Sequence, residues 1–537
     1  MKYLNYILVF ALAVFLPLSS CNTDKLQDLN INPQAVNQIN MNFLFTAAQL
    51  SNASGGATGD NRYIDWRTNI GMCAYAIQHL GNAGGGIAPG DKYTENFETN
   101  HAPFFWLYGG QLKFIAEVLK QTGPNGYDAG NKQNMRNAAR IMKAWNFQRL
   151  TDYYGSVPYT EANQGIEGIF FPKYDKQQDI YPAVLKELEE AAAAMNAGGL
   201  DEGFAAADMY FSGDVAKWKK WAYSIMLRMA MRVSNVDPAL ANQYVTKAVQ
   251  GGVMTSNADN VIVPMALSPS EWINQNGISR AFYPGDGGQP SYLSETLVNW
   301  LKGANPNDAS DDDPRLMVIS GGIADWTPNA WTPINTNPLD QKGLPNGYDQ
   351  AGLDALEGRA VVQSQTYSRI NFLMLQDDDP YMLHNYAEVE FLLAEALQRG
   401  IGSGISGTAK DHYEAGVKAA MQMYTVYDTD PSLIITDEEV AAYLATYPYG
   451  VSKPALEMIG EQLWVSQFFN WWEAWSNWRR TGFPVLIPTD YQNNVTGGQI
   501  PRKLRYPQEE VAGNPNFSSG ATLPDFYLTR VWWDGGN

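Results

Sequence analysis

Hydrophobic and polar positions follow helical spacing along most of this 537-residue chain. The clearest amphipathic segments cover residues 112–119, 135–154, 179–195 and 214–233, and the pattern returns at 386–399, 411–424 and 459–480. In each segment apolar residues recur every three or four positions, which places them on one face of a helix. Glycine and proline separate the segments, as at Gly123-Pro124 and between Gly155 and Pro158. We therefore predict a mainly α-helical protein with paired helices in an α-solenoid-like body.

The character of the sequence changes between about residues 257 and 376. Proline, glycine, asparagine and aspartate crowd this stretch, and helical patterning survives only near residues 292–301. The stretch also contains many aromatic residues: Trp272, Tyr283, Trp300, Trp326, Trp331, Tyr348 and Tyr367. Long loops inside a compact protein are usually functional, and the aromatic residues argue against disorder. We expect a helical body at about 41–256 and 377–537, with an irregular, loop-rich ligand-binding portion and only short strand pairs between them.

The first 20 residues have the pattern of an export signal. Lys2 provides a positive start, an unbroken apolar run extends from Ile7 to Leu16, and small residues lead to Cys21. The apolar run is too short to span a bilayer and matches the layout of a secretory signal peptide. The junction resembles a bacterial lipobox, which predicts a signal peptide over 1–20, lipidation at Cys21 and a polar tether over 21–40. The alternative is an ordinary signal peptide followed by an incidental cysteine.

The formal net charge of the chain is −19, from 56 acidic and 37 basic residues. Such a charge repels phosphate backbones, so nucleic acid is not expected as a ligand. Cys21 and Cys73 are the only cysteines, and acylation of Cys21 would leave Cys73 without a disulfide partner. Beyond the signal, no apolar run approaches the length of a membrane-spanning helix. We therefore expect a body that reaches the membrane through the lipid anchor at Cys21.

Common catalytic patterns are missing from the sequence. It contains no His-Glu-x-x-His helix and no Gly-x-Ser-x-Gly turn, and its four histidines lie far apart. A pair of catalytic carboxylates for glycoside hydrolysis remains an open alternative. Such a pair is defined by its separation in space, which the spacing of 56 acidic residues along the chain does not reveal. The acidic clusters 311–313 and 377–379 could offer oxygen ligands to Ca²⁺, but neither fits an EF-hand and solvated loops are the simpler interpretation. We expect no cofactor, no metal and no enzymatic activity.

Two further patterns are interpreted as structural. Arg228 and Arg232 lie four residues apart on one predicted helix face, where Glu388 or Glu390 could neutralise them. The predicted helix over 459–480 carries one broad aromatic face, formed by Trp464, Phe468, Trp471, Trp472 and Trp475. We expect this helix to be buried and to close the body.

Several segments together resemble the SusD/RagB family of nutrient-binding outer-membrane lipoproteins. They include Tyr153-Tyr-Gly-Ser-Val-Pro158 and Trp478-Arg-Arg-Thr-Gly-Phe-Pro484, with further matches at 172–181, 213–232, 386–396 and 500–507. These segments follow the order of the family over nearly the whole mature chain. The resemblance implies tetratricopeptide-like helix pairs, a less regular ligand-binding portion, no catalysis, and a SusC-like TonB-dependent transporter as partner. It also implies a place in the outer membrane, facing the cell exterior.

The functional prediction is a cell-surface lipoprotein that captures oligosaccharide and delivers it to that transporter. Peptide capture by the same machinery and a surface glycoside hydrolase are the alternatives. Tryptophan and tyrosine offer flat apolar faces for sugar rings, and two loop-rich stretches, 66–106 and 272–331, combine them with turn residues. The predicted ligand contacts are Trp66, Tyr93, Trp272, Tyr283, Trp326 and Trp331, with Asn82 and Asp286 as polar partners.

Overall fold

The computed structural model describes residues 38–54, 63–84, 89–199, 201, 203–270, 273–282, 291–327, 330–521 and 525–536. The predicted signal peptide, Cys21 and most of the predicted tether lie outside these residues. Helices dominate the described part of the chain and its strands are short, so the mainly α fold class is confirmed. A search of the described residues finds no helix with the length and apolar character that crossing a membrane requires.

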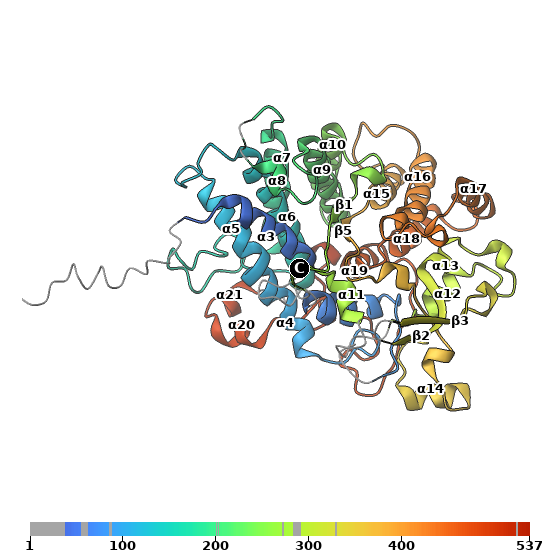
Figure 1. Cartoon of the computed structure of the whole chain (residues 1–537). Coiled ribbons are helices and arrows are strands. Elements are labelled where there is room, and N and C mark those ends of the chain that lie inside the picture. Colours follow the sequence, from blue (N-terminus) through green and yellow to red (C-terminus); the bar gives the residue numbers. More distant parts are fainter. Residues whose placement is uncertain are drawn as a thin grey trace, which may run out of the picture.

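The body consists of consecutive helices that pack against each other in pairs. The pairs are α6 (Gln133–Tyr154) with α7 (Gln177–Ala194), α9 (Val215–Arg232) with α10 (Pro238–Gly251), α15 (Tyr386–Arg399) with α16 (Ala409–Gln422), and α18 (Ala455–Ser466) with α19 (Trp471–Thr481). Ahead of them α3 (Met41–Ser54) packs on α5 (Leu112–Gln121), and α17 (Asp437–Thr446) packs on α16. Shorter helices are α8 (Phe204–Ala207), α20 (Gln508–Gly513) and α21 (Phe517–Gly520). The pairs follow one another around the upper part of the molecule (Figure 1).

Local sequence signals fix where several of these helices begin and end. Asp214 caps α9, because its side chain accepts hydrogen bonds from the backbone of the first turn. Thr408 and Asp411 form a reciprocal capping box at the start of α16. Gly400 follows α15 with a left-handed φ of +67°, a conformation that favours glycine and ends the helix. The boundaries of these three helices are therefore encoded locally.

The irregular portion leaves and re-enters the helical body at one place. Strand β1 (Val261–Val263) pairs antiparallel with β5 (Tyr381–His384), so the chain between them is an insertion between two paired strands. Its strands β2 (Ser320–Thr327), β3 (Ala330–Asn335) and β4 (Ser368–Ile370) form a sheet in the order β3–β2–β4. Its helices are α11 (Gly277–Phe282), α12 (Glu295–Leu301), α13 (Arg315–Ile319) and α14 (Gln350–Glu357). Figure 1 shows α12, α13 and α14 with β2 and β3 at the lower right, beside the body.

The aromatic segment near the C-terminus differs from its prediction. Instead of one helix over 459–480, α18 ends at Ser466 and α19 begins at Trp471. Phe469 between them has a left-handed φ of +75°, which interrupts a right-handed helix and which bulky residues rarely adopt. The predicted burial is confirmed, because each aromatic side chain of the face is at most 4% exposed: Trp464, Phe468, Trp471, Trp472 and Trp475.

A buried ion-pair network links α9 to α15 and α19. The Nε and Nη2 atoms of Arg228 donate to the two carboxylate oxygens of Glu388, both at 2.6 Å, as predicted from the spacing. Arg232 pairs with Glu473 rather than with Glu390. Arg228, Arg232, Glu388 and Glu473 are at most 1% exposed, so charge-assisted hydrogen bonds must offset a large desolvation cost. The arginine motif is thus part of the scaffold.

Candidate ligand-binding surface

The structure joins the two loop-rich stretches that the sequence singles out. The backbone N–H of Gly81 donates to the carbonyl oxygen of Tyr292 at 3.1 Å, and that of Ser294 donates to His79 at 2.9 Å. Helix α11 of the second stretch packs on the π-helix η2 (Asp65–Ala74) of the first. Helix α4 (Phe97–Trp106) in turn packs on η2, and Figure 1 shows α4 and α11 near each other in the lower centre. Segments about 200 residues apart therefore build one region.

A pair of reciprocal hydrogen bonds holds α4 against η2. Asn96 caps α4 by accepting a bond from the backbone of Thr99 at 3.1 Å. Pro103 has no N–H to donate to the carbonyl oxygen of Thr99 one turn earlier, and the hydroxyl of Thr68 donates to that oxygen at 2.8 Å instead. The hydroxyl of Thr99 donates to the carbonyl oxygen of Arg67, also at 2.8 Å. The two helices thus form a rigid support.

Three aromatic side chains form a strip along α4. Phe97, His101 and Phe105 are spaced one helical turn apart, and adjacent ring centroids are 5.5 and 4.9 Å apart with planes tilted by 19° and 22°. Phe97 is 47% exposed and Phe105 is 52% exposed. Rings this exposed contribute little to the core, and contiguous exposed apolar surface marks interaction sites.

The strip continues onto η2 and the residues before it. Phe105 packs edge-on against Trp106 at 5.1 Å, and Trp106 packs against Tyr63 at 5.2 Å. Trp66 and Trp106 are half-buried, with one side packed on the hydrophobic core. We refer to this set as the α4–η2 aromatic face, and its members are Tyr63, Trp66, Phe97, His101, Phe105 and Trp106.

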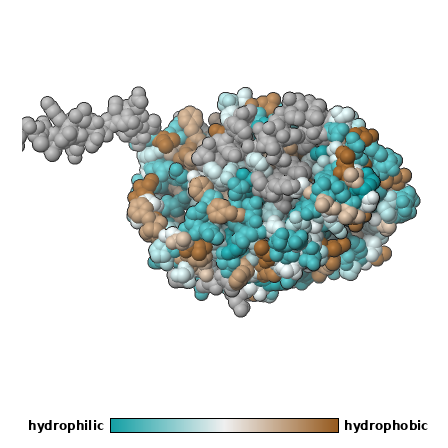
Figure 2. All heavy atoms as spheres, turned by 90° about the horizontal axis from the view of Figure 1, so that it is seen from below, coloured by the Kyte–Doolittle hydropathy of each residue, from teal (hydrophilic) through white to brown (hydrophobic). Residues whose placement is uncertain are grey.

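Charged groups accompany the aromatic face. The guanidinium of Arg67 lies 4.6 Å from the ring centre of Trp66 and forms a salt bridge of 3.0 Å with Glu98. Just before α4, Glu95 pairs with Arg505 at 2.6 Å. Figure 2 views the molecule from below, the side of Figure 1 on which α4 lies, and shows small hydrophobic groups scattered among hydrophilic residues. Apolar rings with adjacent charged donors and acceptors suit an amphipathic ligand such as a sugar.

Three of the predicted contact residues have described side chains. Trp66 belongs to the α4–η2 aromatic face. Asn82 and Tyr93 are each 2% exposed. The Oδ1 atom of Asn82 accepts a hydrogen bond from Gly84 N at 2.8 Å, and the hydroxyl of Tyr93 accepts one from Thr489 N at 3.2 Å. Burial favours a structural role for both residues, and ligand contact at all three stays a prediction.

The other predicted contacts belong to the second stretch. Trp272, Tyr283 and Asp286 lie outside the described residues. The backbones of Trp326 and Trp331 pair directly in the β2–β3 hairpin, but their side chains also lie outside the described part. Ligand contact at these five residues stays a prediction.

Sequence reasoning did not select Phe97, His101 or Phe105. Their spacing was a usable signal, because aromatic residues four positions apart lie on one face of a helix. The sequence could not show whether this face would be exposed or buried. That distinction depends on where α4 packs.

In the acidic clusters, Asp311, Asp313 and Asp379 are engaged with the protein itself. Asp311 accepts a hydrogen bond from the backbone of Ala304 at 3.0 Å, and Asp313 pairs with Arg315 at 2.6 Å. Burial raises the pKa of Asp379 to about 8, so at neutral pH this carboxyl is mostly protonated and a poor cation ligand. Among the described residues, no group of three or more His, Cys, Asp or Glu side chains could hold a metal ion.

A rigid helical body that carries an exposed aromatic face has the architecture of a binding protein. Residues 33–507 match the model of the SusD-like family described as "Starch-binding associating with outer membrane". Because this match covers most of the sequence, the chain belongs to that family. It is therefore a SusD-like protein that associates with the outer membrane. Proteins of this family bind their ligands and do not catalyse a reaction, so the glycoside hydrolase alternative is not supported.

Solved structures support the same assignment. A chitin-binding protein shares 31% sequence identity with this chain at a TM-score of 0.75, with 93% of this chain and 100% of that chain covered. A SusD-like protein from Bacteroidetes AC2a shares 27% identity at a TM-score of 0.78, with 92% and 100% covered. A chitin-binding SusD homologue from Flavobacterium johnsoniae, at 22% identity and a TM-score of 0.71 over 93% and 99%, shares the fold. None of the curated proteins matches the sequence.

Proposed function

We propose that this protein captures an oligosaccharide at the cell surface and delivers it to a SusC-like TonB-dependent transporter in the outer membrane. The α4–η2 aromatic face carries the proposal, because it is an exposed apolar strip on rigid helices in a chain of the SusD-like family. Capture requires binding that is selective and reversible, and a preformed surface of this kind supplies both.

Binding would use the two kinds of surface that a sugar chain presents. The apolar C–H faces of sugar rings would pack on the strip of Phe97, His101 and Phe105, and on the accessible side of Trp66. Hydroxyl groups would bond to charged side chains such as Glu98 beside the strip. Each aromatic contact contributes roughly 0.5–1.5 kcal/mol beyond area burial, so several contacts together give useful affinity.

For the ligand we propose a chain of N-acetylglucosamine units. A relative with 31% identity over 93% of this chain is named a chitin-binding protein, which supports this choice over starch. The acetamido group offers a methyl group for apolar contact and an amide for hydrogen bonding. An uncharged chain also avoids repulsion from the formal net charge of −19.

The decisive experiment is calorimetric titration of the mature protein with chitohexaose, maltohexaose and a mixed peptide library. We expect chitohexaose to bind most tightly. The double variant Phe97→Ala/Phe105→Ala should lower its affinity roughly tenfold or more, since two aromatic contacts are lost. The melting temperature should stay within a degree or two of the wild type, because both rings are about half exposed.

Phe43→Ala is the matched control, since Phe43 is 75% exposed on α3 and lies outside the aromatic face. It should leave chitohexaose affinity unchanged. Equal binding by the wild type and the double variant would refute the role of the aromatic face. Tight binding of peptides with none of hexasaccharides would support the peptide alternative instead.

A further inference from the structure

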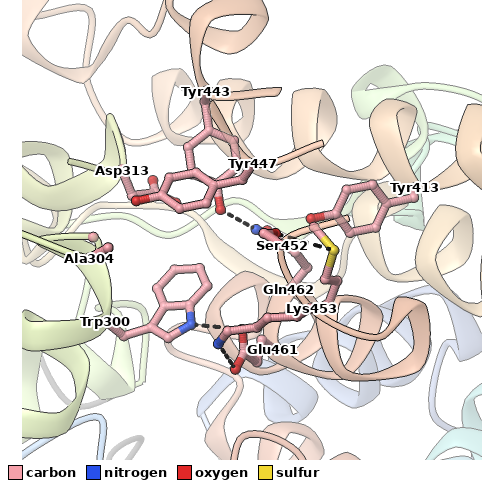
Figure 3. A pocket seen from close by; sticks show the side chains of 12 residues that line it. Trp300, Ala304, Asp313, Tyr413, Tyr443, Tyr447, Ser452, Lys453, Glu461 and Gln462 are labelled. Atoms are coloured by element: carbon pink, nitrogen blue, oxygen red, sulfur yellow. Dashed lines mark hydrogen bonds and ion pairs between the residues drawn. The ribbon is translucent and has the colours of Figure 1, made fainter. Parts of the chain in front are cut away.

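A cavity of about 280 Å³ opens between the irregular portion and the helical body (Figure 3). Its lining comes from α12 and the loop after it, and from α16, α17 and α18. None of these elements contributes to the α4–η2 aromatic face. Ligand sites in proteins start at roughly 300 Å³, so the cavity suits one small ring and not a long chain.

Aromatic side chains line the cavity. Figure 3 shows the indole of Trp300 on one side and the phenol rings of Tyr443 and Tyr447 on the other. Tyr443 and Tyr447 pack together at 5.1 Å, and Tyr413 adds a third phenol. Burial raises the pKa of Tyr443 and Tyr447, so both phenols are neutral hydrogen-bonding groups at physiological pH. The lining therefore offers apolar ring faces with polar edges.

Polar side chains from α18 and the turn before it face the same space. The Oε2 atom of Glu461 accepts a hydrogen bond from Trp300 Nε1 at 3.2 Å, and its Oε1 atom pairs with Lys453 at 2.5 Å. Gln462 donates to the hydroxyl of Tyr443 at 2.9 Å. These bonds fix the orientation of the polar groups, and each carboxylate oxygen still has a lone pair for a further donor.

The cavity is accessible from solvent. The side chain of Lys453 is 42% exposed, and Ala304 and Ser452 are exposed at its rim. A packed interior leaves few voids larger than a water molecule, so an open space of this size between two parts of the fold is not ordinary core packing. Aromatic walls with oriented carboxylate and amide groups match the apolar faces and hydroxyl edges of a sugar.

We propose that this cavity is a second carbohydrate site that holds one pyranose ring between Trp300 and the pair Tyr443 and Tyr447. The apolar face of the ring lies on the indole, and its hydroxyls donate to Glu461 and bond to Gln462. The class of ligand rests on the proposed function, whereas the site rests on the cavity and its lining. For a polysaccharide, a second contact on the same molecule slows release without strengthening either site.

The test uses N-acetylglucosamine itself as probe, with the mature protein in saturation-transfer NMR. Tryptophans labelled with fluorine report the site directly, and the Trp300 resonance is assigned from its loss in Trp300→Phe. Ala304→Trp fills the cavity from its exposed rim without removing a side-chain hydrogen bond. Separately, Ser452→Trp fills it with the loss of one weak bond, from the Ser452 hydroxyl to Met458 Sδ at 3.8 Å. Mannitol, a polyol of similar size that has hydroxyls but no ring, is the control ligand.

We expect N-acetylglucosamine to shift the Trp300 resonance saturably, and mannitol to leave it unchanged. The shift should persist in Phe97→Ala/Phe105→Ala and fall at least fivefold in both rim variants, at unchanged melting temperature. No saturable shift in the wild type, or an equal shift in both rim variants, would overturn the second site. Failure of the proposed function is a separate result, because it is measured as unchanged chitohexaose binding by the double α4 variant.

Discussion

At the scale of single residues, Asp379 is the clearest case of a side chain whose chemistry is set by its surroundings. It is 4% exposed, and its Oδ2 atom accepts a hydrogen bond from Gln376 N at 2.7 Å. Burial, together with the nearby carboxylates of Asp378, Asp428 and Asp377, raises its pKa from 3.8 to about 8. The folded protein therefore holds a proton that the unfolded chain releases.

The stability that this proton confers depends on pH. It is fully present below the unfolded pKa of 3.8 and is lost as pH rises through the folded pKa of about 8. Asp379→Asn is neutral at every pH and keeps an acceptor for Gln376 N. We expect the variant's advantage over the wild type in free energy of unfolding to be larger at pH 8.5 than at pH 5 by more than about 1.4 kcal/mol, the equivalent of one pKa unit.

Urea unfolding at the two pH values measures this difference. Asp378→Asn is the control, since Asp378 is exposed and its loss should give a much smaller gain. A gain for Asp379→Asn of equal size at pH 5 and pH 8.5 would contradict the protonated state of Asp379.

The sequence does not reveal which aromatic side chains are exposed to solvent. Tyr93 and Phe97 are four positions apart in one aromatic-rich stretch, yet one is 2% exposed and the other 47%. Both are aromatic residues of the kind that contacts sugars, so the sequence selects the stretch 66–106 as a candidate but does not show which ring faces solvent. Burial is decided by contacts with distant residues such as Thr489, which spacing along the chain does not reveal.

At the scale of elements, α4 depends on a substitute hydrogen bond. Thr68 supplies the donor that Pro103 lacks, and Thr68 is fully buried. Thr68→Val keeps the shape of the side chain but leaves the carbonyl oxygen of Thr99 unsatisfied. We expect a loss of about 1–3 kcal/mol in free energy of unfolding, together with weaker chitohexaose binding because α4 loosens.

Thr246→Val is the matched control, since the hydroxyl of Thr246 donates to Asn242 at a solvent-exposed site. Water can replace that bond, so the change in stability should be small. Denaturant unfolding compares the two variants. Equal losses in both would show that the Thr68 bond has no special role.

Helix positions were predictable where periodicity and caps agree, as for α9 and α16. The single helix expected over 459–480 was wrong, because Phe469 adopts a left-handed φ of +75° between α18 and α19. Apolar spacing runs through this break without interruption, since both helices face the same core. Tertiary packing therefore overrides the local helical pattern at Phe469, and the sequence has no glycine there that would indicate a break.

At the scale of the whole molecule, the predicted lipid anchor at Cys21 would determine where binding takes place. We predict that Cys21→Ser moves the protein from the membrane fraction to the soluble fraction after the signal peptide is removed. Acyl chains contribute roughly 0.8 kcal/mol for each buried CH₂ group, and the described residues contain no helix fit to span a membrane. Membrane fractionation and immunoblotting provide the measurement.

The same preparations test the partner. A large β-barrel protein should co-purify with the wild type from outer membranes in gentle detergent. Phe97→Ala/Phe105→Ala serves as control, because loss of sugar binding should leave both anchoring and this association intact. Recovery of the wild type only as a free monomer would contradict delivery to a SusC-like transporter.

The pairing of β1 with β5 has a consequence for the exchange of segments between related chains. Because the two ends of the irregular portion are hydrogen-bonded neighbours, its loops can change in length and composition without moving the helices that flank them. The segment between Val263 and Tyr381 therefore begins and ends at neighbouring points of the structure. A chimaera joined at these two strands would exchange the irregular portion as one unit and would leave the α4–η2 aromatic face on the scaffold, so ligand preference at that face should stay with the scaffold.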